Sequence, residues 1–130
     1  GLQGKFSVYH GCAAGLIFGR AGEHEYDDGI VTRDDVVALR RKVVATVDET
    51  IDEAAVDLVA TLKDGRRVHV AVEHAIGSMQ RPMTDAMLEA KFHSQADAVL
   101  GAGRVDALIK ACWGLGQAGD VRALMKAGAK

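Results

Sequence analysis

The stretch VDLVATLKDGRRVHVAV, residues 56–72, decides the fold class of this 130-residue chain. Apolar and polar side chains alternate on both sides of Asp64-Gly65, a dipeptide that favours a tight turn between two strands. The pattern predicts an antiparallel β-hairpin with one apolar face and one face in water. Because such a sheet packs helices on one side only, we expect an α+β fold, a two-layer sandwich with a small, mainly antiparallel sheet and packed helices.

The first helix is predicted from Ser7 to Gly19, since serine is a common N-cap and glycine a common helix end. Gly11, Gly15 and Gly19 fall four residues apart and therefore share one edge of this helix. An interior glycine costs about 1 kcal/mol of helix stability relative to alanine. We therefore expect this edge to allow close approach by another backbone or by a ligand.

Between this helix and the hairpin, Thr32 begins a capping-box pattern for a second helix that ends near Lys42. The β-branched run from Val43 to Val47 indicates a third strand. A sheet of three strands is thin for this many helices, which is typical of a domain that lacks a neighbour.

After the hairpin, residues 73–83 contain Gly77 and the only proline of the chain and are predicted to be irregular. Thr84 is expected to cap a long helix. The predicted buried stripe of that helix holds Met87, Leu88 and Phe92. Two shorter helices, 104–113 and 120–126, are predicted to follow, and the last of them is too short to be stable alone.

The composition excludes several classes of partner. With 48% hydrophobic and 26% charged residues, the chain has the make-up of a globular domain. Its net charge of −2 leaves no basic surface for nucleic acid or an anionic membrane. The longest apolar run is far shorter than the roughly 20 residues that cross a bilayer, and we expect a cytoplasmic protein. Cys12 and Cys112 are expected to be reduced thiols.

The residues with catalytic potential gather at the start of the first helix. The five histidines lack metal-ligand spacing and the glycines form no phosphate-binding motif, so we expect neither a metal nor a nucleotide cofactor. His10 is expected to point to the open side of the first turn, near Lys5 and Ser7. Together these groups suit a carboxylate ligand and proton transfer near neutral pH. The alternative is a surface or helix-capping histidine.

Residues 5–22 resemble the K-F-S helix of the MmgE/PrpD family, which ends in an apolar L-L-x-G-x-x-G pattern. Four further segments recur in that family in the same order, namely residues 36–43, 62–66, 77–85 and 88–92. Family members are similar to 2-methylcitrate dehydratase, cis-aconitate decarboxylase and iminodisuccinate epimerase. The ordered set covers most of the chain.

The resemblance implies a two-domain enzyme with its active site between a large helical domain and a smaller α+β lid. It implies that residues 1–112 form the lid without its first strand, and that residues 113–130 return to an absent helical domain. It also implies a homodimer formed through the helical domain, with no metal or organic cofactor. Gly1 in place of an initiator methionine is consistent with such a fragment.

The activity implied by the resemblance is proton transfer next to a carboxylate in a small di- or tricarboxylic acid. His10 is the expected catalytic residue, and Lys5 and Ser7 are the expected substrate-binding residues. The isolated chain is expected to be inactive, and its residues do not decide among dehydration, decarboxylation and epimerisation. The alternative is a stand-alone α+β binding module in which the glycine-edged helix forms a partner surface.

Overall fold

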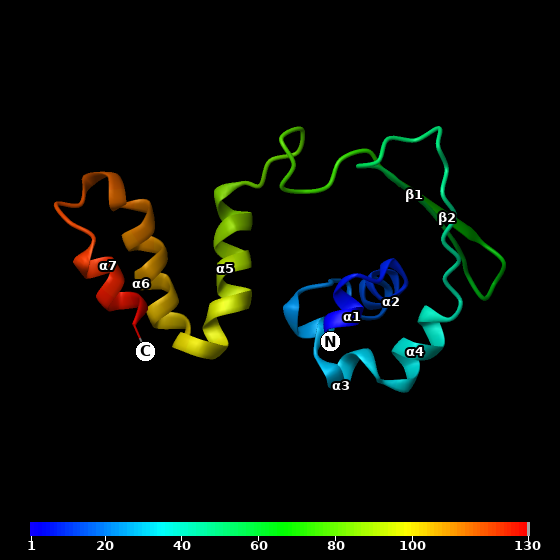
Figure 1. The fold of residues 1–130 in the computed structure, drawn as a ribbon, viewed down its shortest axis with the longest axis horizontal. Coiled ribbons are helices and arrows are strands. Elements are labelled where there is room, and N and C mark those ends of the chain that lie inside the picture. Colours follow the sequence, from blue (N-terminus) through cyan, green and yellow to red (C-terminus); the bar gives the residue numbers. More distant parts are fainter. Residues whose placement is uncertain (130) are drawn as a thin grey trace. The chain divides into compact units, whose positions relative to one another are not determined.

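A computed structural model of the protein describes residues 1–129. The chain forms two compact units, an N-terminal unit of residues 1–48 and a C-terminal unit that begins at Glu49. The first holds α1 to α4, and the second holds the two strands and α5 to α7 (Figure 1). Helices and a small antiparallel sheet in one chain confirm the predicted α+β class.

The N-terminal unit is built around α2. Its elements are α1 (Leu2–Lys5), α2 (Val8–Phe18), the 3₁₀ helix η1 (Glu23–Tyr26), α3 (Asp28–Val31) and α4 (Asp34–Arg40). Ala13, Ala14 and Val36 form its buried apolar core. Since two of these three side chains are single methyl groups, α2 and α4 can pack closely.

Helix α2 begins and ends as the sequence predicts. The Ser7 hydroxyl accepts a hydrogen bond from the backbone N–H of His10 at 3.3 Å. At the other end, Gly19 adopts the left-handed conformation with φ of 70°, and its N–H donates to the carbonyl of Gly15 at 3.0 Å. A residue without a Cβ takes this conformation at little cost, which is why the helix stops here.

Two local predictions for this unit are wrong. Thr32 does not cap α4, because its hydroxyl donates to the carbonyl of Asp28 at 2.7 Å and so belongs to the end of α3. Arg33 takes the N-cap position of α4 instead. Residues 43–47 are not a strand, and the sheet within residues 1–129 has two strands.

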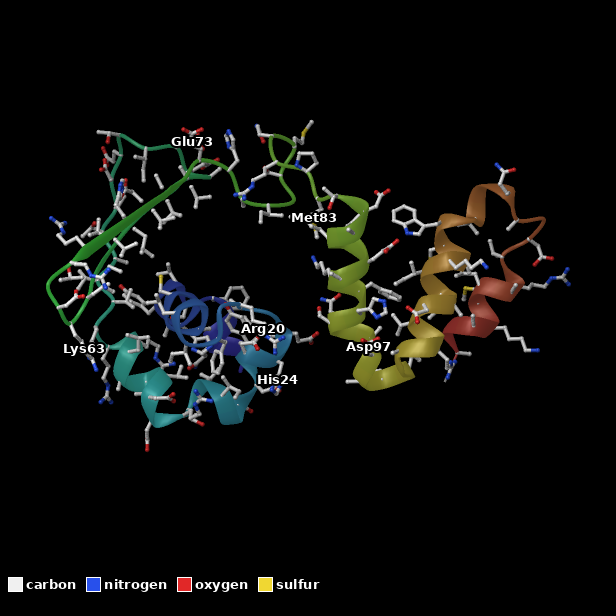
Figure 2. The ribbon with its side chains drawn as sticks, turned by 180° about the vertical axis from the view of Figure 1, so that it is seen from behind. Arg20, His24, Lys63, Glu73, Met83 and Asp97 are labelled. Carbon is white, nitrogen blue, oxygen red and sulfur yellow. The ribbon has the colours of Figure 1, made fainter. Side chains whose placement is uncertain are left out.

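The hairpin of the C-terminal unit follows the predicted pattern. Strand β1 (Val56–Thr61) pairs antiparallel with β2 (Arg67–Val72), with Val56 opposite Val72. Gly65 supplies a positive φ of 86° at the turn, beside Lys63 (Figure 2). Val56 and Val70, on the apolar face, are each 48% exposed. Packing of helices on this face, the second layer of the predicted sandwich, stays a prediction.

Three helices make up the rest of the C-terminal unit: α5 (Asp85–Leu100), α6 (Ala102–Trp113) and α7 (Arg122–Gly128), with the 3₁₀ helix η2 (Leu115–Gln117) before α7. Thr84 caps α5 as predicted, accepting from the N–H of Met87 at 3.2 Å. The predicted stripe on α5 is not buried, since Met87 and Leu88 are each 43% exposed. Val105 and Leu108 of α6 are buried.

Helix α7 rests on α6 (Figure 1). The guanidinium of Arg104 donates to the carbonyl of Ala127 at 3.0 Å and also to that of Ala129. Leu108 lies beside Gly128. The return of residues 113–130 to a helical domain, and the boundary after residue 112, stay predictions. None of the helices within residues 1–129 has both the length and the apolar character required to cross a membrane.

Candidate functional site

His10 is fully buried in the N-terminal unit, so the expectation that it points to the open side is wrong. It is also not the surface histidine of the alternative. The same face of α2 carries Ala13 and Ala14, and these small side chains let the segment after α2 fold back over the ring. That segment includes η1, whose residues are the ring's main polar and aromatic neighbours.

Three groups enclose the imidazole. Its Nε2 lies 2.9 Å from the backbone carbonyl oxygen of Glu25. The Tyr26 ring meets it edge-on, with 4.9 Å between ring centroids and 64° between planes. A Cβ added to Gly4 would lie 3.6 Å from Cδ2 of His10 and 3.1 Å from Val31, so Gly4 permits this close packing.

The predicted close approach to the glycine edge of α2 is not present among residues 1–129. A Cβ on Gly11 would meet the Tyr26 hydroxyl at 3.5 Å, an ordinary contact. For Gly15, no atom of the described residues lies within 4 Å of such a Cβ. In α1, by contrast, a Cβ on Gly4 would press on the Val31 side chain.

The carbonyl of Glu25 determines which ring nitrogen of His10 carries the proton. A carbonyl oxygen only accepts hydrogen bonds, so Nε2 must donate. In the neutral ring, Nδ1 then carries a lone pair. Nδ1 is buried and has no hydrogen-bond partner among residues 1–129. It is thus a buried proton acceptor without a donor.

The side chain of Glu25 is held by two donors, Arg20 Nε at 2.8 Å and the backbone N–H of Gly22 at 2.9 Å. Burial raises the pKa of this carboxyl, but the two hydrogen bonds and the positive charge of Arg20 outweigh it and hold the pKa below its ordinary value. Figure 2 labels Arg20 beside this segment. The ionised carboxylate therefore fixes the turn that carries the Glu25 carbonyl.

Lys5 is exposed and lines a surface hollow of about 250 Å³, called here the Lys5 hollow. Its other walls are Gly1, Leu2, Tyr26 and the carboxylates of Glu23, Asp27 and Asp28. His10 and Ser7 do not line it. Tyr26 does, and because its ring also touches His10, it separates the imidazole from the hollow.

Ser7 is placed one residue before α2, where its hydroxyl oxygen accepts from His10 N–H. A hydroxyl that accepts one bond keeps its own proton to donate. Ser7 can therefore cap the helix and still donate to a ligand oxygen. The structure thus joins Ser7 to His10 through the cap, while Lys5 faces a separate surface.

Within residues 1–129 no group of three histidine, cysteine or carboxylate side chains is arranged to hold a metal ion. Cys12 and Cys112 are free thiols. An apolar hollow of about 150 Å³ lies between α5 and α6, where Trp113 Nε1 donates to the Glu89 carboxylate at 2.7 Å. It lacks the cationic groups that bind a carboxylate, since its walls are Leu88, Glu89, Phe92, Ile109, Cys112 and Trp113.

Residues 20–26, to which the sequence assigned no role, contribute Arg20, Glu25 and Tyr26 to the surroundings of His10. One signal was available. His10, Ala13, Ala14 and Ile17 recur at the three- and four-residue spacing of a buried helix face.

Comparison with known proteins bears on the whole chain rather than on single residues. A family model of the MmgE/PrpD C-terminal domain matches residues 1–115. A search of curated proteins found no match. The matched range includes α1 to α6 and the hairpin, and so covers the N-terminal unit and most of the C-terminal unit.

Proposed function

The chain belongs to the MmgE/PrpD family, and we propose that it forms the lid portion of a cofactor-independent lyase or isomerase. The proposed reaction moves a proton on the carbon next to a carboxylate in a small di- or tricarboxylic acid. The complete enzyme would be a cytoplasmic homodimer with its remaining catalytic groups in a helical domain. Dehydration, decarboxylation and epimerisation all begin or end with this proton transfer.

The observation that carries the proposal is the unpartnered Nδ1 of His10. Leaving a buried polar atom without a hydrogen bond costs about 1 to 3 kcal/mol, and native proteins keep few such atoms. A lone pair kept free inside a protein is ready to accept a proton. His10 is therefore the residue that we assign to proton transfer.

Lys5 and Ser7 are assigned to the carboxylates of the substrate. The Lys5 ammonium is exposed, and the Ser7 hydroxyl lies at the positive end of α2, an 11-residue helix with no acidic side chain in its first turn. Because Nδ1 is buried, the substrate must reach it by displacing a neighbour, and Tyr26 is the neighbour that also faces the Lys5 hollow.

Charge around the Lys5 hollow argues that this chain is not the complete site. Glu23, Asp27 and Asp28 line the hollow together with Lys5 and with Gly1, whose ammonium pairs with Asp28, so the negative charges outnumber the positive ones and would repel a polyanion. Further cations must therefore come from elsewhere, which agrees with a site completed by a helical domain. We expect the isolated chain to show no turnover.

The test compares this chain with the native polypeptide that contains it, each incubated with a panel of di- and tricarboxylic acids and a metal chelator. Loss of at least one acid with the native polypeptide only is the expected result. Turnover by this chain alone would refute the proposal that the active site is shared with a helical domain. No reaction with any acid would count against the proposed chemistry.

Lys5→Ala in the native protein is predicted to raise KM about tenfold or more while changing kcat less, because a charge-assisted hydrogen bond to the substrate is lost. Lys5→Arg keeps the charge and should restore most of the affinity. Lys63→Ala, at the hairpin turn, removes an exposed lysine outside the N-terminal unit and serves as the control. Equal KM values for Lys5→Ala and Lys63→Ala would remove Lys5 from substrate binding.

A second candidate function is a binding module without catalysis. The observation that favours it is the exposed apolar surface, including Leu16 on α2, which is 60% exposed, and the apolar face of the hairpin. This alternative predicts that the native polypeptide has the mass of this chain and leaves every acid of the panel unchanged. A several-fold larger mass would favour the enzyme.

A further inference from the structure

The surroundings of His10 assign a role to a residue that has no part in the proposed chemistry. We propose that Glu25 is a positioning residue that holds His10 as the Nε2–H tautomer, through its backbone carbonyl, and holds that carbonyl in place through its own side chain. The use of the Nδ1 lone pair in catalysis rests on the proposed function. The assignment of the tautomer does not depend on that function.

The contact between Nε2 of His10 and the Glu25 carbonyl fixes where the ring carries its proton. It is buried, 2.9 Å long, and joins residues that are fifteen positions apart. A free histidine ring exchanges its proton between both nitrogens, whereas a ring with one nitrogen held against a carbonyl keeps the proton there. A fixed Nε2–H makes Nδ1 the acceptor in every neutral molecule.

The side chain of Glu25 holds this carbonyl in place. A 3₁₀ helix of four residues has few internal hydrogen bonds and needs outside support. The Glu25 carboxylate supplies it by accepting from Gly22 N–H and from Arg20, so the turn is tied to the chain that precedes it. With this carboxylate 3% exposed, water competes little for either bond.

Tyr26 follows Glu25 directly and packs its ring edge-on against the imidazole. Rotation of the His10 ring about its Cβ–Cγ bond, which would carry Nε2 away from the Glu25 carbonyl, has to displace the Tyr26 ring. One short segment therefore fixes the tautomer through Glu25 and the ring orientation through Tyr26.

The test is a two-bond ¹H–¹⁵N correlation spectrum of the imidazole groups in the uniformly ¹⁵N-labelled chain, at a pH where His10 is neutral. This experiment distinguishes a protonated from an unprotonated ring nitrogen. The expected result for His10 is a protonated Nε2 and an unprotonated Nδ1. The opposite tautomer, or a mixture like that of a free histidine, would overturn the proposal.

Glu25→Ala and Arg20→Gln test the role of the side chain. Both are expected to convert the single His10 tautomer into a mixture, while backbone amide signals confirm that the unit is folded. Glu23→Ala, an exposed glutamate of the same η1 helix, is the matched control and should leave His10 unchanged. If Glu25→Ala fails to fold, Arg20→Gln decides, because the Arg20 side chain is 69% exposed and Gly22 still binds the carboxylate.

The same variants in the native protein separate this proposal from the proposed function. Glu25→Ala should lower kcat about tenfold to a hundredfold with KM little changed, and should add no further loss in a protein that already carries His10→Ala. A folded Arg20→Gln or Glu25→Ala variant with an unchanged His10 tautomer would refute the positioning role even if His10 is essential. A fixed tautomer in a protein whose activity survives His10→Ala would refute only the catalytic role.

Discussion

At the scale of single residues, His10 combines two properties that rarely coincide. It is fully buried, yet one ring nitrogen has no partner among the described residues. The bond from Nε2 to the Glu25 carbonyl accounts for a polar side chain at this position, but it leaves the free Nδ1 unexplained. The proposed proton transfer would give that nitrogen a use.

His10→Ala in the native protein is predicted to reduce kcat by about 10² to 10⁴, the usual contribution of a general acid or base. His24→Ala is the control, since His24 lies in η1 but is exposed and paired with Asp27 at 2.6 Å. Steady-state kinetics with the acid identified from the panel provide the measurement. A change within a few-fold for His10→Ala would exclude His10 from catalysis.

The sequence predicts contacts between neighbours well and contacts between distant residues poorly. The cap between Ser7 and His10 N–H spans three positions, was predicted, and is present. The contact between His10 and Glu25 spans fifteen positions and depends on how residues 20–26 turn back. In the sequence, only the small side chains of Ala13 and Ala14 indicate that another segment packs on this face of α2.

At the scale of elements, the hairpin and the third predicted strand differ in whether a pairing strand lies nearby in the sequence. Residues 56–72 carry both strands and the turn within one stretch, so the ladder forms from local sequence alone. Residues 43–47 have the β-branched composition of a strand, but no partner strand pairs with them within residues 1–129. Strand propensity reflects packing and pairing, which a run of valines cannot supply by itself.

Replacing Gly15 inside α2 and Gly19 at its C-terminal end by alanine should change the free energy of unfolding in opposite directions. Gly19→Ala is predicted to destabilise the N-terminal unit by about 1 kcal/mol, because φ of 70° is strained for a residue with a Cβ. Gly15→Ala is predicted to stabilise it by about 0.5 to 1 kcal/mol, since it lies inside the helix with open space around a Cβ among the described residues. Urea titration followed through amide signals of α2 measures both, and destabilisation by Gly15→Ala would mean that another group approaches this edge.

Helices α5 and α6 are linked by His93, whose Nδ1 lies 2.9 Å from Asp97 and whose Nε2 lies 3.3 Å from Asp106. Hydrogen bonding to Asp97 and the charges of Asp97, Asp106 and Glu89 raise the pKa of His93, although desolvation opposes them. A raised folded-state pKa stabilises the folded form below the ordinary value of 6.5, and this stabilisation is lost as pH rises through the folded-state pKa. Asp97 lies near the end of α5 in Figure 2.

The coupling energy between His93 and Asp97, measured by a double-mutant cycle of His93→Gln and Asp97→Asn, is therefore predicted to be larger at about pH 5.5 than at about pH 8.5. Urea unfolding of the four proteins at both pH values gives this energy. A coupling energy that is independent of pH would contradict the assignment of a charged pair.

At the scale of the whole molecule, the chain leaves much apolar surface uncovered. Phe6, Val47 and Met79 are more than four-fifths exposed, and Val56 and Val70 on the apolar face of the hairpin are each 48% exposed. The hydrophobic pattern predicted which face of each element is apolar, but a pattern does not specify the surface that covers it. Membership of the MmgE/PrpD family supports the interpretation that a larger enzyme supplies it.

The most direct test of the account is proton exchange by the native polypeptide in D₂O, with a metal chelator present and a panel of di- and tricarboxylic acids as substrates. Mass spectrometry of the acids detects deuterium placed on the carbon next to a carboxylate by decarboxylation, by epimerisation or by reversible dehydration. The account predicts deuterium in at least one acid or its product, and its loss in the His10→Ala protein. An absence of exchange with every acid, in a folded native protein, would contradict it.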